Sequence, residues 1–271
     1  MPWVNVDDFQ LYWAGDLKEA GGVVAFVHGA GGNHTHWLPQ IAHLRSLPGW
    51  SVVAFDLPGH GRSGGEARAS IPEYAGVIFR ALGAMVASGG AAPCGGASGG
   101  RPVVVAGHSM GGAIALEMAL TYPGFLAGLI LVGTGARLRV LPAALEKMSR
   151  GERDETLLRL AYGPEAPPGL LKRGRAEYQA VPVEVLYRDY SACDRFDRMQ
   201  EVGELQLPTL VVVGAEDALT PPKYSRYLAE RLQGKLYVVP GCGHMVMLEK
   251  PTPVNEALTE FLTNLVHARE H

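Results

Sequence analysis

The sequence lacks an excess of charge of either sign. Among its 271 residues, 24 Lys and Arg are balanced by 27 Asp and Glu, so the formal net charge is −3. A net charge this small gives no electrostatic reason to expect binding to nucleic acid or to an anionic membrane surface. We therefore expect neither kind of partner.

Long hydrophobic runs and paired cysteines are also missing. No apolar stretch approaches the roughly 20 residues of a membrane-spanning helix, and the first residues show no basic region or apolar core of a secretory signal. The three cysteines, Cys94, Cys193 and Cys242, are scattered and have no metal-ligand spacing. These absences predict a reduced, cytoplasmic protein without a membrane span. The sequence carries no signal for the oligomeric state.

Apolar residues are plentiful and follow a regular order. Hydrophobic residues make up 47% of the chain and charged residues 19%, as in a globular protein with a substantial core. Short, continuous apolar runs alternate with helical patterns, and such runs are typical of strands buried on both faces of a parallel sheet. The alternation predicts a doubly wound α/β architecture. The expected strands are residues 23–27, 52–55, 103–106, 129–132, 209–213 and 236–239.

The remaining elements are expected around these strands. Residues 3–9 and 11–14 predict an antiparallel hairpin at one edge of the sheet. The expected helices are residues 37–47, 71–87, 111–121, 222–232 and 253–267.

Two segments interrupt the alternation. Residues 88–100 are so rich in Gly and Ala that they offer few side chains to pack, which predicts a mobile surface loop. Residues 137–205 lie where a single crossover helix would suffice, yet they contain at least three helical patterns, around 141–150, 154–161 and 183–192. We interpret this segment as a helical cap inserted into a core domain of residues 1–136 and 206–271. The alternative, an irregular long connection, is uncommon in compact domains.

Three stretches match the pattern G-x-S-x-G, centred on Ser63, Ser98 and Ser109. With 35 glycines in the chain, chance matches are frequent. Only Ser109 follows an apolar β-branched run and precedes a strong helix former, which is the strand–turn–helix context of a nucleophile elbow. Ser109 is therefore the predicted nucleophile, and an ordinary strand-to-helix turn is the alternative.

A serine nucleophile needs a base within hydrogen-bond reach and a carboxylate that orients the base. Asp217, with Glu216 as the adjacent alternative, follows an expected strand at the carboxyl end, where α/β sheets gather functional groups. His244 follows the last expected strand in a Gly-rich turn that can aim the imidazole back toward the sheet. The order Ser109, Asp217, His244 is the nucleophile–acid–base order of one hydrolase class.

Other histidines are weaker candidates. His34 and His36 are spaced like a metal-binding pair, but the sequence lacks the nearby Asp-His that would complete a metallohydrolase ligand set, so no metal is expected. His108 adjoins the elbow serine, and the residue in that position normally points away from the reacting centre.

A developing oxyanion needs hydrogen-bond donors. The Met110 amide, at the start of the helix after the elbow, is one candidate. The second donor is expected within residues 28–32 (His-Gly-Ala-Gly-Gly), directly after the first parallel strand. We assign it to the Ala30 amide, with the Gly31 amide as the alternative.

The chain resembles the α/β-hydrolase superfamily, and within it the capped serine esterase and lipase-like branch. The elbow also resembles that of monoacylglycerol lipases. The resemblance implies a mostly parallel eight-stranded sheet flanked by helices, a triad of Ser109, Asp217 and His244, and an oxyanion hole of the Ala30 and Met110 amides. It covers nearly the whole chain and rests on residues 28–32, 56–63, 107–111, 214–217 and 243–244.

In such proteins the loop at residues 56–63 is structural, so His60 and Ser63 are expected to have structural roles. The resemblance implies a serine hydrolase that cleaves a carboxylic ester of small to medium acyl chain without a cofactor. A serine at position 109 argues against the aspartate-nucleophile chemistry of haloalkane dehalogenases and epoxide hydrolases. Thioester, carbon–carbon or lactone hydrolysis and perhydrolysis stay open on the same triad, and a non-catalytic ligand receptor is a remote alternative.

Substrate specificity is expected to come from the cap and the catalytic loops. Trp37, Tyr162 and Met245 are candidate substrate-binding residues, although each is equally compatible with core packing. The charged residues of the cap are expected to form a solvated face rather than to bind substrate. They are Arg173, Arg175, Glu177, Arg188 and Asp189.

Overall fold

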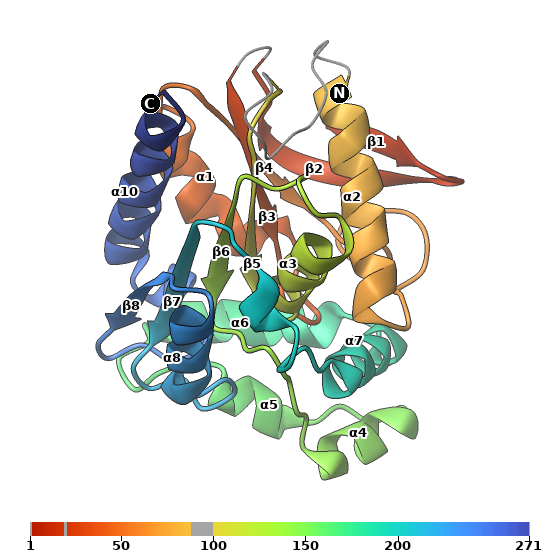
Figure 1. Ribbon diagram of the computed structural model, residues 1–271. Coiled ribbons are helices and arrows are strands. Elements are labelled where there is room, and N and C mark those ends of the chain that lie inside the picture. The colour runs from red at the N-terminus through yellow and green to blue at the C-terminus, as the bar shows by residue number, and fades with distance from the viewer. Residues whose placement is uncertain (1, 19–20, 88–99, 271) are drawn as a thin grey trace.

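An eight-stranded sheet lies at the centre of the computed structural model, which describes residues 2–18, 21–87 and 100–270 (Figure 1). The strands are Trp3–Val6 (β1), Phe9–Asp16 (β2), Gly22–Val27 (β3), Trp50–Phe55 (β4), Val103–His108 (β5), Gly128–Val132 (β6), Thr209–Gly214 (β7) and Lys235–Val239 (β8). Their order across the sheet is β1-β2-β4-β3-β5-β6-β7-β8. The two pairs that involve β2 are antiparallel and all the others are parallel. The predicted mostly parallel sheet is confirmed.

Each central strand is buried on both faces, which explains its continuous apolar sequence. In β3, for example, Val23, Ala25 and Val27 point into one apolar core. The intervening residues Val24 and Phe26 point into a second core on the opposite face. A strand with polar residues at alternate positions would place them in one of these cores.

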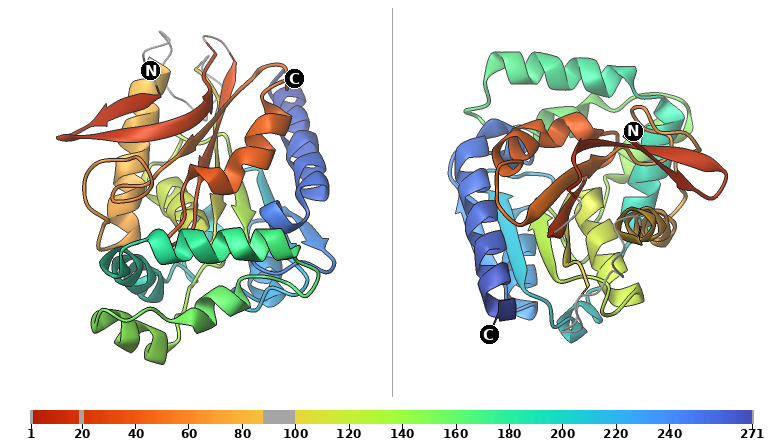
Figure 2. Two further views of the ribbon diagram at one scale, coloured as in Figure 1. Left: turned by 180° about the vertical axis from the view of Figure 1, so that it is seen from behind. Right: turned by 90° about the horizontal axis from the view of Figure 1, so that it is seen from above.

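Helices cover both faces of the sheet, as the view from above shows (Figure 2). One face carries Ile71–Ala87 (α2), Met110–Thr121 (α3) and Pro222–Arg231 (α8). The other face carries Leu38–Leu44 (α1), Val246–Glu249 (α9) and Pro251–Glu270 (α10). Two short 3₁₀ helices span His34–Trp37 (η1) and Val202–Glu204 (η2). This arrangement is the predicted layered α/β architecture.

The edge hairpin differs from the prediction in its turn. Val6 pairs with Phe9, so the chain reverses at Asp7 and Asp8 and not at Gln10. Asp7 adopts a φ of 51°, a conformation that Asp and Asn tolerate better than most residues. Asp7 and Asp8 are residues of a type common in turns, and they are the local signal for this reversal.

Four helices lie between β6 and β7, in the segment that the sequence marked as an insertion. They are Pro142–Ser149 (α4), Glu155–Leu160 (α5), Pro168–Ala180 (α6) and Val183–Arg195 (α7). Figures 1 and 2 show them beyond the carboxyl ends of the parallel strands. The sequence predicted three of them and missed α6, because Pro167 and Pro168 read as breakers. Pro168 instead occupies the start of α6, where its missing N–H costs nothing.

Most of the Gly/Ala-rich tract, including Cys94 and Ser98, lies outside the described residues. Among the helices that are described, none combines the length and the apolar character needed to cross a membrane.

Candidate active site

Ser109 occupies a sharp turn between β5 and α3. Its φ of 54° and ψ of −116° are unusual for a residue with a side chain. The backbone around it is tied down, because its N–H donates to Val132 O across 2.9 Å and its carbonyl accepts from Thr134 Oγ1 across 2.8 Å. A Cβ at Gly111 would lie 2.2 Å from Val27 O, so only glycine lets helix and strand approach this closely. The sequence predicted this elbow from the same glycine pattern.

Asp217 and His244 are hydrogen bonded, although 27 residues separate them in the sequence. His244 Nδ1 lies 2.9 Å from Asp217 Oδ2, and both side chains are nearly inaccessible to solvent. Burial alone would raise the pKa of Asp217, but the His244 charge and hydrogen bonds from His244 and Thr220 hold that pKa below its ordinary value. The alternative acid, Glu216, is exposed to solvent.

Ser109 and His244 line one cavity of about 210 Å³, together with Ala30 of the loop at residues 28–32. Two of the three predicted substrate-binding residues, Tyr162 and Met245, also line this cavity. Apolar side chains from the insertion form much of its remaining wall, including those of Leu138, Val140, Leu141, Leu157 and Leu158.

Trp37 does not line the cavity, and its prediction as a substrate-binding residue is wrong. Its side chain is completely buried between the sheet and its covering helices, where its ring centroid lies 4.6 Å from that of Phe26. The large apolar surface of the indole is better removed from water in this core than at the mouth of a cavity.

The two amides that are predicted to bind the oxyanion lie in different surroundings. Met110 buries its side chain in the core, and its amide lies in the first turn of α3, where N–H groups have no partner within the helix. Ala30 lies in the cavity wall itself. The alternative donor, the Gly31 amide, is already used, because it donates to Asp189 Oδ2 across 2.8 Å.

Two supporting residues were missed by sequence reasoning. The Thr220 hydroxyl lies 2.8 Å from Asp217 Oδ2 and 3.2 Å from His244 Nδ1. His108 Nε2 lies 3.0 Å from the His244 carbonyl oxygen. Burial and the nearby His244 ring hold the pKa of His108 well below its ordinary value, so this imidazole is neutral. A hydroxyl three residues after the acid is a signal that could have identified Thr220.

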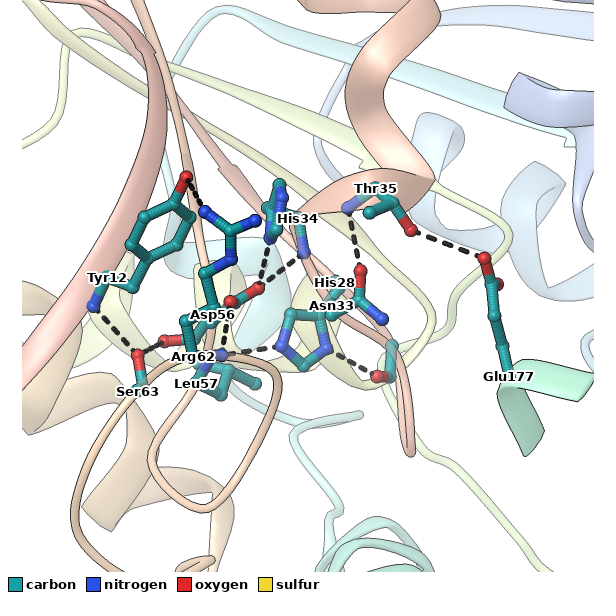
Figure 3. Close-up of polar contacts among 11 residues, drawn as sticks. Tyr12, His28, Asn33, His34, Thr35, Asp56, Leu57, Arg62, Ser63 and Glu177 are labelled. Atoms are coloured by element: carbon teal, nitrogen blue, oxygen red, sulfur yellow. Dashed lines mark hydrogen bonds and ion pairs between the residues drawn. The ribbon is translucent and has the colours of Figure 1, made fainter. Parts of the chain in front are cut away.

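The loop at residues 56–63 is held by a polar network that Figure 3 shows. Asp56, at the end of β4, accepts hydrogen bonds from the backbone and ring nitrogens of His34 and from the Arg62 amide, at 2.7 to 2.8 Å. The Ser63 hydroxyl donates to the Asp56 carbonyl across 2.6 Å and accepts from the Tyr12 amide across 2.9 Å. Ser63 therefore has a structural use.

The histidines that suggested a metal pair are used separately. His34 bonds to Asp56, while His36 Nε2 lies 3.4 Å from Glu177 Oε2. Among the described residues there is no group of three or more His, Cys, Asp or Glu side chains that could hold a metal ion.

The expected solvated face of the insertion is only partly exposed. Arg173, Arg175 and Arg188 do reach solvent. The side chain of Asp189, in contrast, has no exposed surface, and that of Glu177 is 25% exposed and lines the cavity. The prediction is wrong for these two carboxylates. The spacing of polar residues along a helix cannot show whether its polar face meets solvent or packs against polar groups of another segment.

Known proteins resemble this chain over most of its length. "Putative carbamate hydrolase RutD" of Azorhizobium caulinodans is 29% identical, over 96% of this chain and 98% of its own. A pimeloyl-[acyl-carrier protein] methyl ester esterase of Neisseria meningitidis is 29% identical, over 82% of this chain and 85% of its own. A solved thermophilic esterase is 34% identical, with a TM-score of 0.80 and 97% of each chain covered.

A model of the alpha/beta hydrolase family matches residues 24–257, which include the elbow, Asp217 and His244. The sheet order and the position of the elbow after β5 agree with that match. The chain therefore belongs to the alpha/beta hydrolase family and is a hydrolase.

Proposed function

We propose that this hydrolase cleaves carboxylic esters of small to medium acyl chain through Ser109, His244 and Asp217. The observation that carries the proposal is the buried Asp217–His244 hydrogen bond in the wall of the same cavity that Ser109 lines. A serine on a strained elbow, a histidine and a carboxylate that fixes its tautomer are the parts that nucleophilic acyl transfer needs.

In the proposed reaction, His244 Nε2 accepts the Ser109 proton while Ser109 Oγ attacks the ester carbonyl. The hydrogen bond from Nδ1 to Asp217 keeps the proton on Nδ1 and leaves Nε2 free to act as the base. Asp217 also stabilises the imidazolium that forms. His244 then protonates the leaving alcohol, and water repeats the sequence on the acyl-enzyme.

The amides of Ala30 and Met110 are proposed to bind the tetrahedral oxyanion. Removing one such donor costs about 3–4 kcal/mol in other serine hydrolases, so each amide accounts for a large part of the rate. The support for this assignment is that the competing Gly31 amide already donates to Asp189. A cap formed by residues 137–205 is proposed to supply the acyl pocket.

The size and lining of the cavity support short acyl groups. Its volume of about 210 Å³ is below the roughly 300–1,000 Å³ of sites that hold drug-sized ligands. Leucine is the most frequent residue type in the wall contributed by the insertion, which favours an alkyl chain over a polar acyl group.

The test is a panel of p-nitrophenyl esters of increasing chain length, assayed beside a monoacylglycerol, an acyl thioester, a carbamate and a β-diketone. We expect kcat/KM to be highest for short to medium esters. Activity on the β-diketone with none on any ester would overturn the proposal, as would esters hydrolysed equally well by a Ser109→Ala variant.

A further inference from the structure

We infer that Asp189 of α7 is a positioning residue that holds the loop at residues 28–32 in the orientation that presents the Ala30 amide to the reaction. We call this loop the oxyanion loop. The inference rests on the proposed function, because the direction of the Ala30 N–H matters to catalysis only if that group binds an oxyanion.

Asp189 accepts three hydrogen bonds from three separate parts of the core. Oδ2 accepts from the Gly31 amide and from His60 Nε2, both across 2.8 Å. Oδ1 accepts from the Tyr74 hydroxyl of α2 across 2.6 Å. The carboxylate is completely buried, and a buried charge is tolerated only when donors satisfy it in this way. Helix α7 therefore contacts the oxyanion loop through the Asp189 carboxylate, both of whose oxygens accept hydrogen bonds.

The hydrogen-bond pattern indicates that Asp189 and His60 form a charged pair. His60 Nδ1 lies 3.0 Å from the Pro58 carbonyl oxygen, which can only accept, so this nitrogen carries a proton. Asp189 accepts from Tyr74 on Oδ1 and from Gly31 on Oδ2, and the nearby His60 and these donors hold its pKa below its ordinary value, so it is ionised and accepts from His60 Nε2. With protons on both ring nitrogens, His60 is an imidazolium.

The neighbouring His28 is neutral by the same reasoning. Its Nε2 accepts from the Leu57 amide across 3.0 Å, while its Nδ1 lies 2.8 Å from the Gly29 carbonyl oxygen (Figure 3). Burial, together with the His60 charge, lowers the pKa of His28 to about 3. Asp189 thus faces one cation and two neutral donors, and His28, the first residue of the oxyanion loop, is tied to Leu57 of the loop at residues 56–63.

The oxyanion loop forms a turn whose central peptide takes one of the two orientations that are open to such turns. The Gly32 amide donates to the Gly29 carbonyl across 3.0 Å, and Gly31 has a φ of 63° at the third position, as a type II turn requires. A type I turn over the same residues would reverse the Ala30–Gly31 peptide. The Ala30 carbonyl oxygen would then face the Asp189 carboxylate in place of the Gly31 N–H.

That reversed state brings two acceptors together and leaves Asp189 short of a donor, so Asp189 selects the observed orientation. The flip itself would leave the Ala30 N–H in the preceding Gly29–Ala30 peptide unturned, but the Asp189 contact with the Gly31 N–H holds the Ala30 Cα in place and so restricts how far that N–H can move. Leu186, one turn before Asp189 on α7, packs on the same loop, since a Cβ at Gly31 would lie 2.5 Å from Leu186 Cδ2. Apolar and polar contacts from one helix therefore hold this turn.

The test compares Asp189→Leu, which keeps the branched shape of the side chain but replaces both acceptor oxygens by larger methyl groups, with the wild type. We expect kcat for a p-nitrophenyl ester to fall about 10-fold or more, with KM within about twofold, because the contact acts on transition-state binding. The inhibition constant of an alkylboronic acid, whose serine adduct places an oxygen in the oxyanion hole, should rise by about the same factor as kcat falls.

Two control variants separate positioning from general loosening of α7. Asp189→Asn keeps an oxygen that can accept from Gly31, and we expect it to restore kcat to within about threefold of the wild type. Arg188→Ala removes a neighbouring attachment of α7 to the Ala67 carbonyl without touching the oxyanion loop, and it should leave kcat and boronate affinity unchanged. An equal loss in Arg188→Ala, or unchanged boronate affinity in Asp189→Leu, would overturn the inference.

A measurement on the wild-type protein keeps the inference testable if Asp189→Leu does not fold. In a ¹⁵N-labelled sample, the Gly31 amide should exchange with solvent at least about 100-fold more slowly than an exposed loop amide. Exchange at the rate of an exposed amide would rule out the Asp189 contact. A wild-type protein without esterase activity but with a protected Gly31 amide would instead discard the proposed function alone.

Discussion

The Thr220 hydroxyl donates to Asp217 Oδ2 across 2.8 Å, and the same oxygen receives the His244 ring N–H across 2.9 Å. The other oxygen, Oδ1, accepts from the Leu219 and Thr220 amides at 2.9 and 2.8 Å. Four donors therefore fix the orientation of this carboxylate before substrate arrives. Pre-organisation of this kind determines how well an acid holds its histidine partner.

Thr220→Val should lower kcat about 10-fold and leave KM nearly unchanged. Valine keeps the shape of threonine but removes one donor to a buried carboxylate, and a hydrogen bond to a charged group contributes about 1.5–3 kcal/mol. Steady-state kinetics on the best p-nitrophenyl ester measures the effect. Thr220→Ser, which retains the hydroxyl, is the control and should stay within about threefold of the wild type, while equal losses in both variants would contradict this role.

Two serines in the same sequence pattern should respond in opposite ways to replacement by alanine. Ser109→Ala should lower kcat at least about 10³-fold with little change in the free energy of unfolding, because it removes the attacking oxygen. Ser63→Ala should retain kcat but lose about 1–3 kcal/mol of stability, because the Tyr12 amide and the Asp56 carbonyl would each lose a partner.

Kinetics and urea unfolding of both variants test this pair of expectations. The variants are matched, because each replaces the central serine of a G-x-S-x-G stretch. A large loss of kcat in Ser63→Ala with normal stability would show that the pattern alone had misidentified the nucleophile.

Several features of the fold followed from the sequence because they depend on local patterns. Continuous apolar runs identified all six parallel strands, and the elbow glycines marked the place where α3 crosses close to β3. Ser109, Asp217 and His244 follow three such strands, so the parallel sheet alone brings them to one edge.

The features that the sequence did not reveal depend on contacts between distant segments. Asp189 looks like a surface residue of an amphipathic helix, and only the packing of α7 against the oxyanion loop buries it. Trp37 lies near the catalytic loops in sequence, yet its direction depends on the 3₁₀ turn η1, which points the indole into the core. The residues next to Asp189 and Trp37 in the sequence give no indication that either side chain is buried.

Glu177 should make the cavity selective against anionic acyl groups. A hydrogen bond from His36 lowers the pKa of Glu177, and so does the charge of Arg173, which makes it ionised at neutral pH. Its contacts with His36, Thr35 and Arg173 are long, at 3.4, 3.5 and 3.6 Å, so its charge is only weakly compensated. We expect kcat/KM for p-nitrophenyl hexanoate to exceed that for mono-p-nitrophenyl adipate about 10-fold or more.

Glu177→Gln should reduce that preference by about 3- to 10-fold, chiefly by improving adipate hydrolysis. Glu184→Gln is the matched control, because it makes the same change in net charge at a position that is 72% exposed and paired with Arg188. Equal effects of the two variants would mean that overall charge, and not the cavity carboxylate, sets the preference.

The His60–Asp189 pair should give the protein a stability that declines at alkaline pH. Burial opposes charge on both groups, but their mutual attraction raises the pKa of His60 and lowers that of Asp189. The His60 contribution is therefore fully present below its unfolded pKa of 6.5 and is lost as pH rises through the raised value. The Asp189 contribution is present above 3.8 and is lost as pH falls through the lowered value.

Urea unfolding of the wild type and of His60→Gln between pH 6 and pH 10 measures this effect. The difference in the free energy of unfolding should be largest near pH 6 and should shrink by about 1.4 kcal/mol for each unit by which folding raises the pKa of His60. The other groups around the pair have shifted pKa values in both proteins, so their contributions to the pH dependence largely cancel in the difference. The pKa of His28 is about 3, that of Asp56 is lowered, and those of Tyr74 and Cys193 are raised. A stability difference that stays constant from pH 6 to pH 10 would mean that His60 is neutral in the folded protein.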